Sequence, residues 1–440
     1  MPYVVTRNKP RKRNVDIFAF LDDLITLDML RPVTKFETTG TKTFYYDYIK
    51  PAKLRELNIP KQIEILSSFY DRYKDLDICN GNPEYDYELQ IKLDSRYNRL
   101  EHDEDSIKEK VIDELNKRGL KYNSLYTTFY IPKSSSTPGH PKWRRIDAPS
   151  EKLKVCLRGM KSIFEVLMDG CYYHTSAFAY ISNRSAKDAV ERHAKNKSNW
   201  FLKLDFSNFF GSTTLDFVME MFSEVYPFSE IVKSEAGKTV LKKCLNLCFL
   251  NGGLPQGTPM SPLITNIMMI AIDHKISNGL KKMTVESPNG HKNSFVYTRY
   301  ADDMMISNRF KFDYREVIEF IEKVLNEYSA PFSLNKEKTR FGSNAGENWV
   351  LGIMLNQQYK TSVGHKRKKR LKAMINNYML DRANGISWGY QELTHLQGEI
   401  SYCRSIEKET IDRILTMYAN GSEGVMDAIK HDLKELAKPM

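Results

Sequence analysis

The sequence has few cysteines, and their spacing fits neither a zinc site nor a disulfide framework. The 440 residues contain six cysteines, with no Cys-x-x-Cys pair and no paired histidine spacing, which excludes a structural zinc ligand set. A chain of this length corresponds to about two to three domains and can bury several cores, so a disulfide-stapled mini-protein is also excluded. Cys244 and Cys248 stand one helical turn apart in VLKKCLNLCFL, where we expect two buried core thiols.

Long apolar runs, internal repeats and low-complexity tracts are absent as well. No run of about 18 uninterrupted apolar residues occurs, and the basic start MPYVVTRNKPRKRNV is not followed by the apolar segment of a signal peptide. We therefore expect a cytoplasmic protein without a membrane partner.

Acidic residues are the minority among the charged ones. Aspartate plus glutamate number 55 against 66 lysines and arginines, which gives a formal net charge of +11. Such a surplus favours a polyanionic partner, either nucleic acid or an anionic membrane surface, and a merely soluble basic surface remains the alternative. Because 41% of the residues are hydrophobic and the charged residues carry both signs, wholesale disorder is excluded.

The character of the sequence changes along the chain. Residues up to about 125 are charged and lean toward helix, and they show no chemistry that the sequence reveals. The segment YIPKSSSTPGHPKWRRIDAPS at 130–150 has a Pro/Ser/Gly-rich centre between two strand-like pieces, which predicts a hairpin with a basic tip. Between 200 and 356, strand-like and helical segments alternate, and we expect an α+β layer: a four-stranded antiparallel sheet backed by helices.

The last part of the chain reads as a separate helical domain. The charge run HKRKKR at 365–370 opens a segment whose apolar residues recur on one face of a helix. These are Leu371, Met374, Ile375, Tyr378 and Met379.

Three aspartates stand where carboxylates can converge on divalent cations. Asp205 ends the apolar strand FLKLDF, while Asp302 and Asp303 lie at the tip of a predicted hairpin between SFVYTRY and MMISNRF. Magnesium prefers oxygen ligands and is usually held by one or two carboxylates together with substrate phosphates. On these residues alone, a polar turn without any catalytic role remains the more common reading of an Asp-Asp pair.

Six motifs occur in order, namely KWRRIDAP, FLKLDFSNFF, GLPQGTPMSPLITN, YADD, LNKEKT and VLGI. With them the sequence resembles the reverse transcriptase family over roughly residues 120 to 420, most closely the bacterial enzymes of the retron and group II intron lineage and their defence-associated relatives. The resemblance implies a right-hand polymerase fold of the α+β class. Its parts would be an N-terminal helical extension (1–120), fingers (121–200), palm (201–356, with part of the fingers within) and helical thumb with the C-terminal tail (357–440).

The resemblance also implies a reaction and its catalytic residues. Asp205 and Asp302 would bind two Mg²⁺ ions, assisted by Asp303 and by the backbone carbonyl of Phe206. One ion would lower the pKa of the primer 3′-hydroxyl, and the other would hold the triphosphate and neutralise the leaving pyrophosphate. Lys338 in LNKEKT matches the lysine that protonates the pyrophosphate, with a solvated surface lysine as the alternative.

Nucleotide contacts are implied at four further positions. Phe210 matches the steric gate that rejects ribonucleotides, although a core aromatic shared with Phe209 is the alternative. Gln256 and Gly257 in LPQG would line the incoming base and its template partner. Arg144 would clamp the triphosphate, because a guanidinium makes forked contacts to phosphate.

Other residues are implied to contact phosphate or the nucleic acid. Lys142 or Lys133 would assist Arg144 at the triphosphate. Leu351 and Gly352 match the turn that grips the primer end. The thumb helix would contact the template-primer backbone through its basic start, at Lys366, Arg367, Lys368, Lys369 and Arg370.

Two departures refine the resemblance. Retron enzymes carry N-A-x-x-H and V-T-G signatures, whereas this chain reads DAVERH at 188–193 and VLG at 350–352. Intron-encoded proteins continue beyond the thumb, whereas this sequence stops soon after LTMYANG. By analogy, we expect a defence-associated reverse transcriptase that copies a dedicated non-coding template RNA into cDNA from dNTPs.

Three alternatives remain open on the sequence. One is a nucleotidyltransferase that works without a template or primes on protein. Another is a retron- or intron-type reverse transcriptase with a different biological role. The third is a binding protein with an inactive polymerase fold. The presence of all three aspartates argues against it.

Overall fold

The chain forms two compact units, each made of three chain segments. The first contains Met1–Thr175, Phe206–Lys275 and Ile321–Leu334, and the second contains Ser176–Asp205, Ile276–Phe320 and Asn335–Met440. The computed structural model describes residues 4–7, 30–38, 41–48, 59–79, 125–132, 143–168, 173–287, 289–343, 352–356, 358–419 and 424–437.

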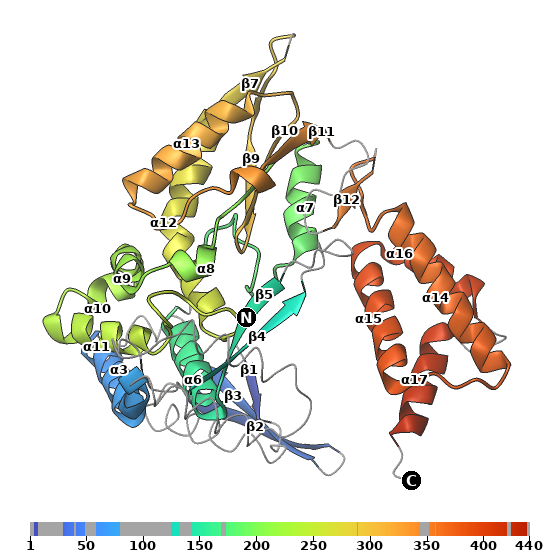
Figure 1. Ribbon diagram of the computed structural model, residues 1–440, viewed down its shortest axis with the longest axis horizontal. Coiled ribbons are helices and arrows are strands. Elements are labelled where there is room, and N and C mark those ends of the chain that lie inside the picture. Colours follow the sequence, from blue (N-terminus) through green and yellow to red (C-terminus); the bar gives the residue numbers. More distant parts are fainter. Residues whose placement is uncertain are drawn as a thin grey trace, which may run out of the picture. The chain divides into compact units, whose positions relative to one another are not determined.

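A four-stranded antiparallel sheet is the centre of the second unit (Figure 1). Its strand order is β11-β6-β10-β9, which confirms the predicted α+β fold and the predicted sheet. The strands span Arg340–Ser343 (β11), Trp200–Asp205 (β6), Asp303–Asn308 (β10) and Val296–Tyr300 (β9).

The two faces of this sheet differ because successive side chains on a strand point to opposite sides. One face carries fully buried Leu202, Leu204, Met304 and Ile306. In the register of the sheet Asp205 lies opposite Asp303, and Lys203 lies opposite Met305. The carboxylates therefore project from the other face, at the end where β6 stops and β10 starts.

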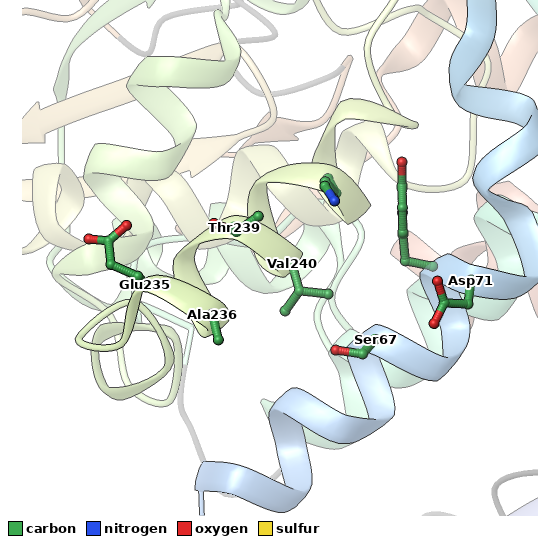
Figure 2. Close-up of a pocket in the computed structure, with 8 residues that line it drawn as sticks. Ser67, Asp71, Glu235, Ala236, Thr239 and Val240 are labelled. Atoms are coloured by element: carbon green, nitrogen blue, oxygen red, sulfur yellow. The ribbon is translucent and has the colours of Figure 1, made fainter.

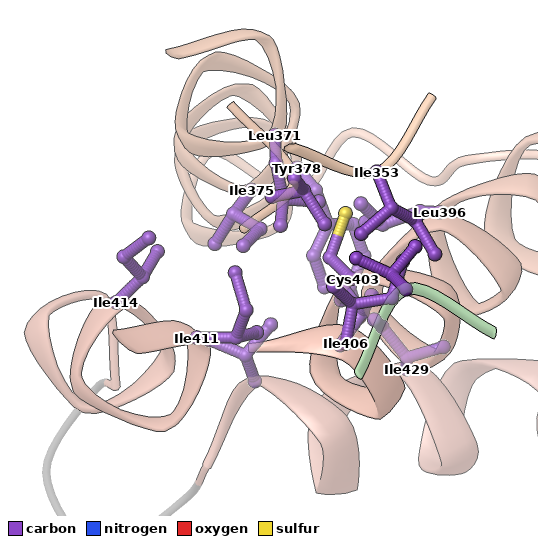
Figure 3. Close-up of a cluster of buried hydrophobic side chains, with 14 of the residues drawn as sticks. Ile353, Leu371, Ile375, Tyr378, Leu396, Cys403, Ile406, Ile411, Ile414 and Ile429 are labelled. Carbon is purple, nitrogen blue, oxygen red and sulfur yellow. The ribbon is translucent and has the colours of Figure 1, made fainter. Parts of the chain in front are cut away.

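Four helices at the end of the chain form a bundle in the second unit (Figure 3). Their buried side chains share one core with Phe201 and Met305 of the sheet. Leu371, Ile375 and Tyr378 of the first helix are buried, on the face that the sequence pattern indicated. Burying side chains of this size contributes about 1.5–3 kcal/mol each relative to exposure. The helices are α14 (His365–Ala383), α15 (Tyr390–Ile406), α16 (Lys408–Met417) and α17 (Val425–Leu436).

Smaller elements complete the second unit. The helix α7 spans Ala186–Lys195, and the short 3-10 helix η2 spans Lys336–Lys338. Two antiparallel pairs are β7 (Thr284–Glu286) with β8 (Lys292–Ser294), and β12 (Met354–Leu355) with β13 (Thr361–Ser362). Two long helices, α12 (Ser261–Lys282) and α13 (Tyr314–Glu327), are divided between the units.

The first unit is mainly helical and carries the predicted hairpin. The strands β4 (Tyr126–Pro132) and β5 (Trp143–Pro149) pair antiparallel, as the segment 130–150 predicted. The helices are α3 (Ile59–Tyr73), α6 (Glu151–Leu167), α8 (Phe209–Ser212), α9 (Leu215–Ser223), α10 (Phe228–Ile231) and α11 (Glu235–Asn246), with the 3-10 helix η1 at Lys74–Cys79. Cys244 and Cys248 on and after α11 are fully buried free thiols, as expected.

The first 120 residues contain a β-sheet that was not predicted. Residues 1–120 were predicted to be helical, and α3 is, but this region also contains a three-stranded antiparallel sheet of order β1-β3-β2. Its strands are β1 (Val4–Arg7), β2 (Leu30–Thr38) and β3 (Thr41–Tyr48). The segment TKTFYYDY of β3 is rich in the aromatic and β-branched residues that favour strands, and its charged neighbours obscured that signal. Among the helices that the structure describes, none is long and apolar enough to cross a bilayer.

Candidate active site

A two-residue turn between β9 and β10 presents two of the three aspartates. Tyr300 pairs with Asp303, so Ala301 and Asp302 form the turn. Ala301 has a φ of 57°, a left-handed conformation that costs a residue with a side chain about 1–2 kcal/mol. The buried guanidinium of Arg299 donates a hydrogen bond of 3.0 Å to the carbonyl oxygen of Ala301, which helps to hold the turn in this shape.

Asp205 receives a lysine from the segment that precedes β11. Lys338 Nζ donates to Asp205 Oδ2 at 2.7 Å; the carboxylate is only 7% exposed, whereas the lysine side chain is 57% exposed. Asn335 fixes this segment, because its backbone N–H donates to the Asp205 carbonyl at 2.7 Å and its side chain accepts from Lys338 N. The structure therefore brings two residues predicted for the site, 133 positions apart, into contact.

Asp303 has a lysine partner of its own. Lys203 lies two residues before Asp205 on β6, so both side chains leave the same face, and Lys203 Nζ is 3.0 Å from Asp303 Oδ1. Sequence reasoning did not single out Lys203 or Asn335. The alternation Lys203-Leu204-Asp205 in a predicted strand was a signal for the first, and the Asn-Lys-Glu-Lys start of a short helix was a signal for the second.

The electrostatics of the turn reflect crowding of negative charge. Burial raises the pKa of Asp302 above its ordinary value, and the charge of Asp205 raises it further. Burial also raises the pKa of Asp303, although Lys203 opposes this shift. For Lys338, burial lowers the pKa, but the hydrogen bond to Asp205 and the three carboxylate charges outweigh it, so the net direction is upward. The cluster thus attracts cations.

A metal ion could bind to this cluster only if the substrate supplied some of its ligands. Within the described residues, no group of three or more Asp, Glu, His or Cys side chains is arranged to hold a metal by itself. Magnesium does not require such a cage, because it is commonly bound by one or two carboxylates together with substrate phosphates and water. The hard oxygen donors and their mutual repulsion suit a divalent cation, and Lys203 and Lys338 already supply positive charge beside two of the carboxylates.

The predicted steric gate lies in the first unit, on the short helix α8. Phe209 is fully buried and stacks with Phe206 at 5.1 Å between ring centroids, whereas Phe210 is only partly buried. The neighbouring Phe209, and not Phe210, therefore fills the core. The carbonyl of Phe210 accepts a hydrogen bond of 2.9 Å from Leu254 N, which ties the helix to the loop that carries Gln256.

The loop with Gln256 and Gly257 is also tied to the strand of Arg144. Asp147 N donates to the Gln256 carbonyl at 3.0 Å. Gly257 has a φ of 108°, a conformation that favours glycine. A Cβ there would also lie 3.1 Å from Ile146 Cγ2, which is a tight contact. Arg144 is exposed and leaves the same face of β5 as Ile146. Of the residues predicted to bind nucleotide, Phe210, Gln256, Gly257 and Arg144 thus lie on connected segments of the first unit.

Two glycines that sequence reasoning missed support this group. A Cβ on Gly253 would collide with the backbone carbonyl of Gly211, and a Cβ on Gly211 would lie 2.6 Å from Asn208 Oδ1. Backbone therefore meets backbone where the loop rests on α8. No single-sequence signal distinguishes these glycines from ordinary turn glycines.

A groove of about 710 Å³ in the second unit contains part of the predicted nucleic-acid contacts. Gly352, with a φ of 80°, and Met354 form part of its wall. Four cationic or titratable side chains of α14 also line it: His365, Lys366, Arg367 and Arg370.

The five basic residues at the start of α14 divide into two classes. Arg367 forms a forked ion pair with Glu399 (2.9 and 3.2 Å) and lies over the Tyr402 ring, and Lys368 pairs with Glu407 at 3.0 Å. Lys366, Lys369 and Arg370 are exposed, and within the described residues no ion pair involves them. The three exposed residues are therefore the stronger candidates for binding phosphate. Lys133, Lys142 and Leu351 lie outside the described residues.

A second hollow, of about 390 Å³, lies between α3 and α11 in the first unit (Figure 2). Figure 2 shows Ser67 and Asp71 on one side and Thr239 and Val240 on the other. None of the residues predicted for the active site lines it.

Comparisons with known proteins show which family this chain belongs to. The profile of the reverse transcriptase (RNA-dependent DNA polymerase) family matches residues 131–367, more than half of the chain. The Retron Ec83 reverse transcriptase of Escherichia coli is 26% identical over 310 residues, which cover 68% of this chain and 88% of that protein. The Retron Mx65 reverse transcriptase of Myxococcus xanthus is 26% identical over 308 residues, which cover 66% and 63%.

Among solved structures, telomerase from Candida albicans in complex with a fragment of telomeric RNA aligns with 92% of this chain and 62% of its own. Its TM-score is 0.41 and its identity 12%, too low to bear on fold or function. The family profile is sufficient: the chain belongs to the reverse transcriptase (RNA-dependent DNA polymerase) family.

Proposed function

We propose that this reverse transcriptase transfers nucleotides by a two-metal mechanism at Asp205, Asp302 and Asp303. The observation that carries the proposal is the register of the sheet, which puts Asp205 directly opposite Asp303 with Asp302 in the adjoining turn. Like charges directly opposite each other destabilise a strand pair. A chain that keeps three carboxylates at such a place has a use for a cation there.

In this proposal each residue has one task. Asp205 and Asp302 hold two Mg²⁺ ions, with Asp303 and the Phe206 carbonyl assisting. When bound, the ions would make the primer 3′-hydroxyl more acidic and neutralise the leaving pyrophosphate. Lys338 carries a proton at Nζ and has more than half of its side chain exposed, so it can swing toward the pyrophosphate oxygen and donate that proton.

The predicted nucleotide-binding residues of the first unit would select the nucleotide. The partly exposed ring of Phe210 would exclude a 2′-hydroxyl. Gln256 and Gly257 would present a flat backbone to the base pair. Arg144 would bind the triphosphate through its guanidinium.

The second-unit groove would bind the template-primer duplex. Lys366, Lys369 and Arg370 are exposed and form no ion pair within the part of the chain that the structure describes, so they would contact phosphates. Gly352 lies on the groove wall. In these terms residues 121–200, 201–356 and 357–440 act as fingers, palm and thumb, preceded by the extension 1–120.

We further propose that the template is a dedicated non-coding RNA and that the cDNA serves antiphage defence. The support is the motif resemblance and the similarity to retron reverse transcriptases. Sequencing of nucleic acid that co-purifies with the full chain, with and without phage, tests this. One recurrent RNA with complementary DNA supports it, whereas homopolymer or random DNA contradicts it.

Primer extension tests the catalytic proposal. The full chain is incubated with poly(rA)·oligo(dT), dTTP and Mg²⁺. Asp302→Asn should abolish extension, because it removes one ligand charge. Asp313→Asn is the matched control, since Asp313 is an exposed aspartate of the same unit and should leave extension unchanged. Extension by Asp302→Asn at the wild-type rate would refute the assignment.

A further inference from the structure

His193 joins the two strands that carry the catalytic turn. It lies on α7, whose first turn is fixed by a capping box between Ser185 and Asp188. The imidazole is fully buried. Its Nδ1 is 2.6 Å from Ser307 Oγ on β10, and its Nε2 is 2.8 Å from Thr298 Oγ1 on β9. Both ring nitrogens are therefore used, and each contacts a different strand of the same hairpin.

The direction of these hydrogen bonds follows from the neighbours. Ser307 donates its hydroxyl proton to Ser198 Oγ at 2.7 Å, so Ser307 must accept from His193 Nδ1–H. A neutral imidazole has one donor and one acceptor, which leaves Nε2 to accept from the Thr298 hydroxyl. Burial, aided by the charge of Arg192, lowers the pKa of His193 to about 3, so the ring stays neutral. The chain of bonds is fully satisfied and has one arrangement.

The position of these contacts relates them to the active site. Thr298 lies opposite Met305, and Ser307 lies opposite Val296, so both hydroxyls are on the face that carries Asp303. Each is four residues from the nearer aspartate of the turn, about 13 Å along a strand at about 3.3 Å per residue. At the turn itself, Arg299 from the opposite face holds the Ala301 carbonyl.

We propose that His193 is a positioning residue, the His193 clamp, that fixes the register of β9 against β10 and thereby the place of Asp302 and Asp303. A slip of one residue turns every side chain of a strand to the other face, and a smaller shear would displace the turn between the strands. The clamp opposes both movements because its ring spans the two strands with directed bonds. This inference deepens the proposed function and rests on it for the role of the two aspartates.

An ordinary buried histidine that satisfies its hydrogen bonds is the simpler alternative. It would stabilise the fold without affecting the reacting groups. The two readings differ in what a hydroxyl deletion changes: a structural loss lowers overall stability, whereas a lost clamp loosens the hairpin and slows chemistry without weakening template-primer binding.

The test compares isosteric changes in the full chain. Thr298→Val and Ser307→Ala each remove one partner of the ring. Thr361→Val is the control, because the Thr361 hydroxyl lies in the same unit and donates to the Ile406 carbonyl instead of to His193. Hydrogen exchange is measured over residues 296–308, and dTTP addition to poly(rA)·oligo(dT) gives kcat and the KM for template-primer.

We expect faster exchange of the β9 and β10 amides in Thr298→Val and Ser307→Ala, and unchanged exchange there in Thr361→Val. We also expect kcat to fall roughly 10- to 100-fold with the template-primer KM unchanged, the scale on which small misplacements of reacting groups act. Equal exchange in Thr298→Val and Thr361→Val, or faster exchange with an unchanged kcat, overturns the clamp. A wild-type chain that adds no nucleotide would defeat the proposed function instead, and the exchange comparison would still decide whether His193 holds the hairpin.

Discussion

Replacement of Lys338 by methionine should make the metal-free protein less stable and should also make Mg²⁺ bind more tightly. The substitution keeps most of the length of the side chain and removes the ammonium that lies 2.7 Å from Asp205 Oδ2. Fully exposed ion pairs contribute about 0.2–1 kcal/mol, and removal of one partner of a fully buried pair costs about 3–5 kcal/mol. Because Asp205 is buried and Lys338 is half exposed, we expect a loss of about 1–2 kcal/mol.

The same contact opposes metal binding. A cation at Asp205 must displace Lys338 Nζ, so the energy that the lysine contributes without metal is subtracted from metal affinity, and the coupling is reciprocal. The stability difference between Lys338→Met and wild type should therefore shrink as Mg²⁺ is added. Without the proton donor, the rate of nucleotide addition should nevertheless fall, by about 10²-fold or more for a lost general acid.

Urea unfolding in EDTA and at saturating Mg²⁺ measures the first effect, and calorimetric Mg²⁺ titration measures the second. Lys336→Met is the control, because Lys336 is an exposed lysine of the same short helix and takes part in no ion pair among the described residues. An equal stability loss in EDTA and in Mg²⁺, or unchanged Mg²⁺ affinity, would refute the competition.

Three further predictions concern charge and selectivity. Asp302→Asn should abolish synthesis yet raise the Tm of the metal-free protein at pH 7, because the raised pKa of Asp302 means that its ionisation opposes folding. This gain should shrink as the pH falls through the raised pKa of Asp302 and should vanish below its ordinary value of 3.8, where the carboxyl is protonated in both states. Phe210→Ala should admit ribonucleotides in primer extension. Lys366→Ala with Arg370→Ala should weaken template-primer binding and reduce the salt dependence of log Kd by about two units.

Each of these has an outcome that would count against it. A Tm gain for Asp302→Asn that persists at pH 3 would show that charge is not its cause. Unchanged discrimination between dTTP and UTP would remove Phe210 from the gate. The control for Lys366→Ala with Arg370→Ala is Lys408→Ala with Arg413→Ala, which removes two exposed cations of α16. An equal loss of template-primer affinity in the control would show that the groove on α14 is not the binding site.

The sequence predicted the sheet and most helices because their patterns are local. The helical spacing of Leu371, Ile375 and Tyr378 reflects one face, and the structure buries that face. The apolar segment FLKLDF forms a strand with buried side chains on both faces. The three-stranded sheet at the front was missed, because strands whose partners lie within a charged segment give a weak local signal.

The sequence could not predict which side chains far apart in the chain form ion pairs with each other. Asp205 and Lys338 were each selected by motif, but their contact depends on Asn335 and on the sheet register. Similarly, HKRKKR gives no sign that Arg367 and Lys368 are neutralised by glutamates 32 and 39 positions away. Composition counts charges, whereas only the fold shows which of them are already paired.

The contact between Gly211 and Gly253 has a consequence for how this enzyme can change. Gly253 of the loop that bears Gln256 lies against the main-chain carbonyl of Gly211 on α8, so this contact does not involve the side chain of Phe210. Phe210 can then be exchanged for other residues without rebuilding the support beneath it. Gly253 should be intolerant of every substitution in a saturation screen, whereas Gly211, whose added Cβ would meet only the Asn208 side chain, should accept small residues. Phe210, the proposed gate, would remain open to selection for a different sugar.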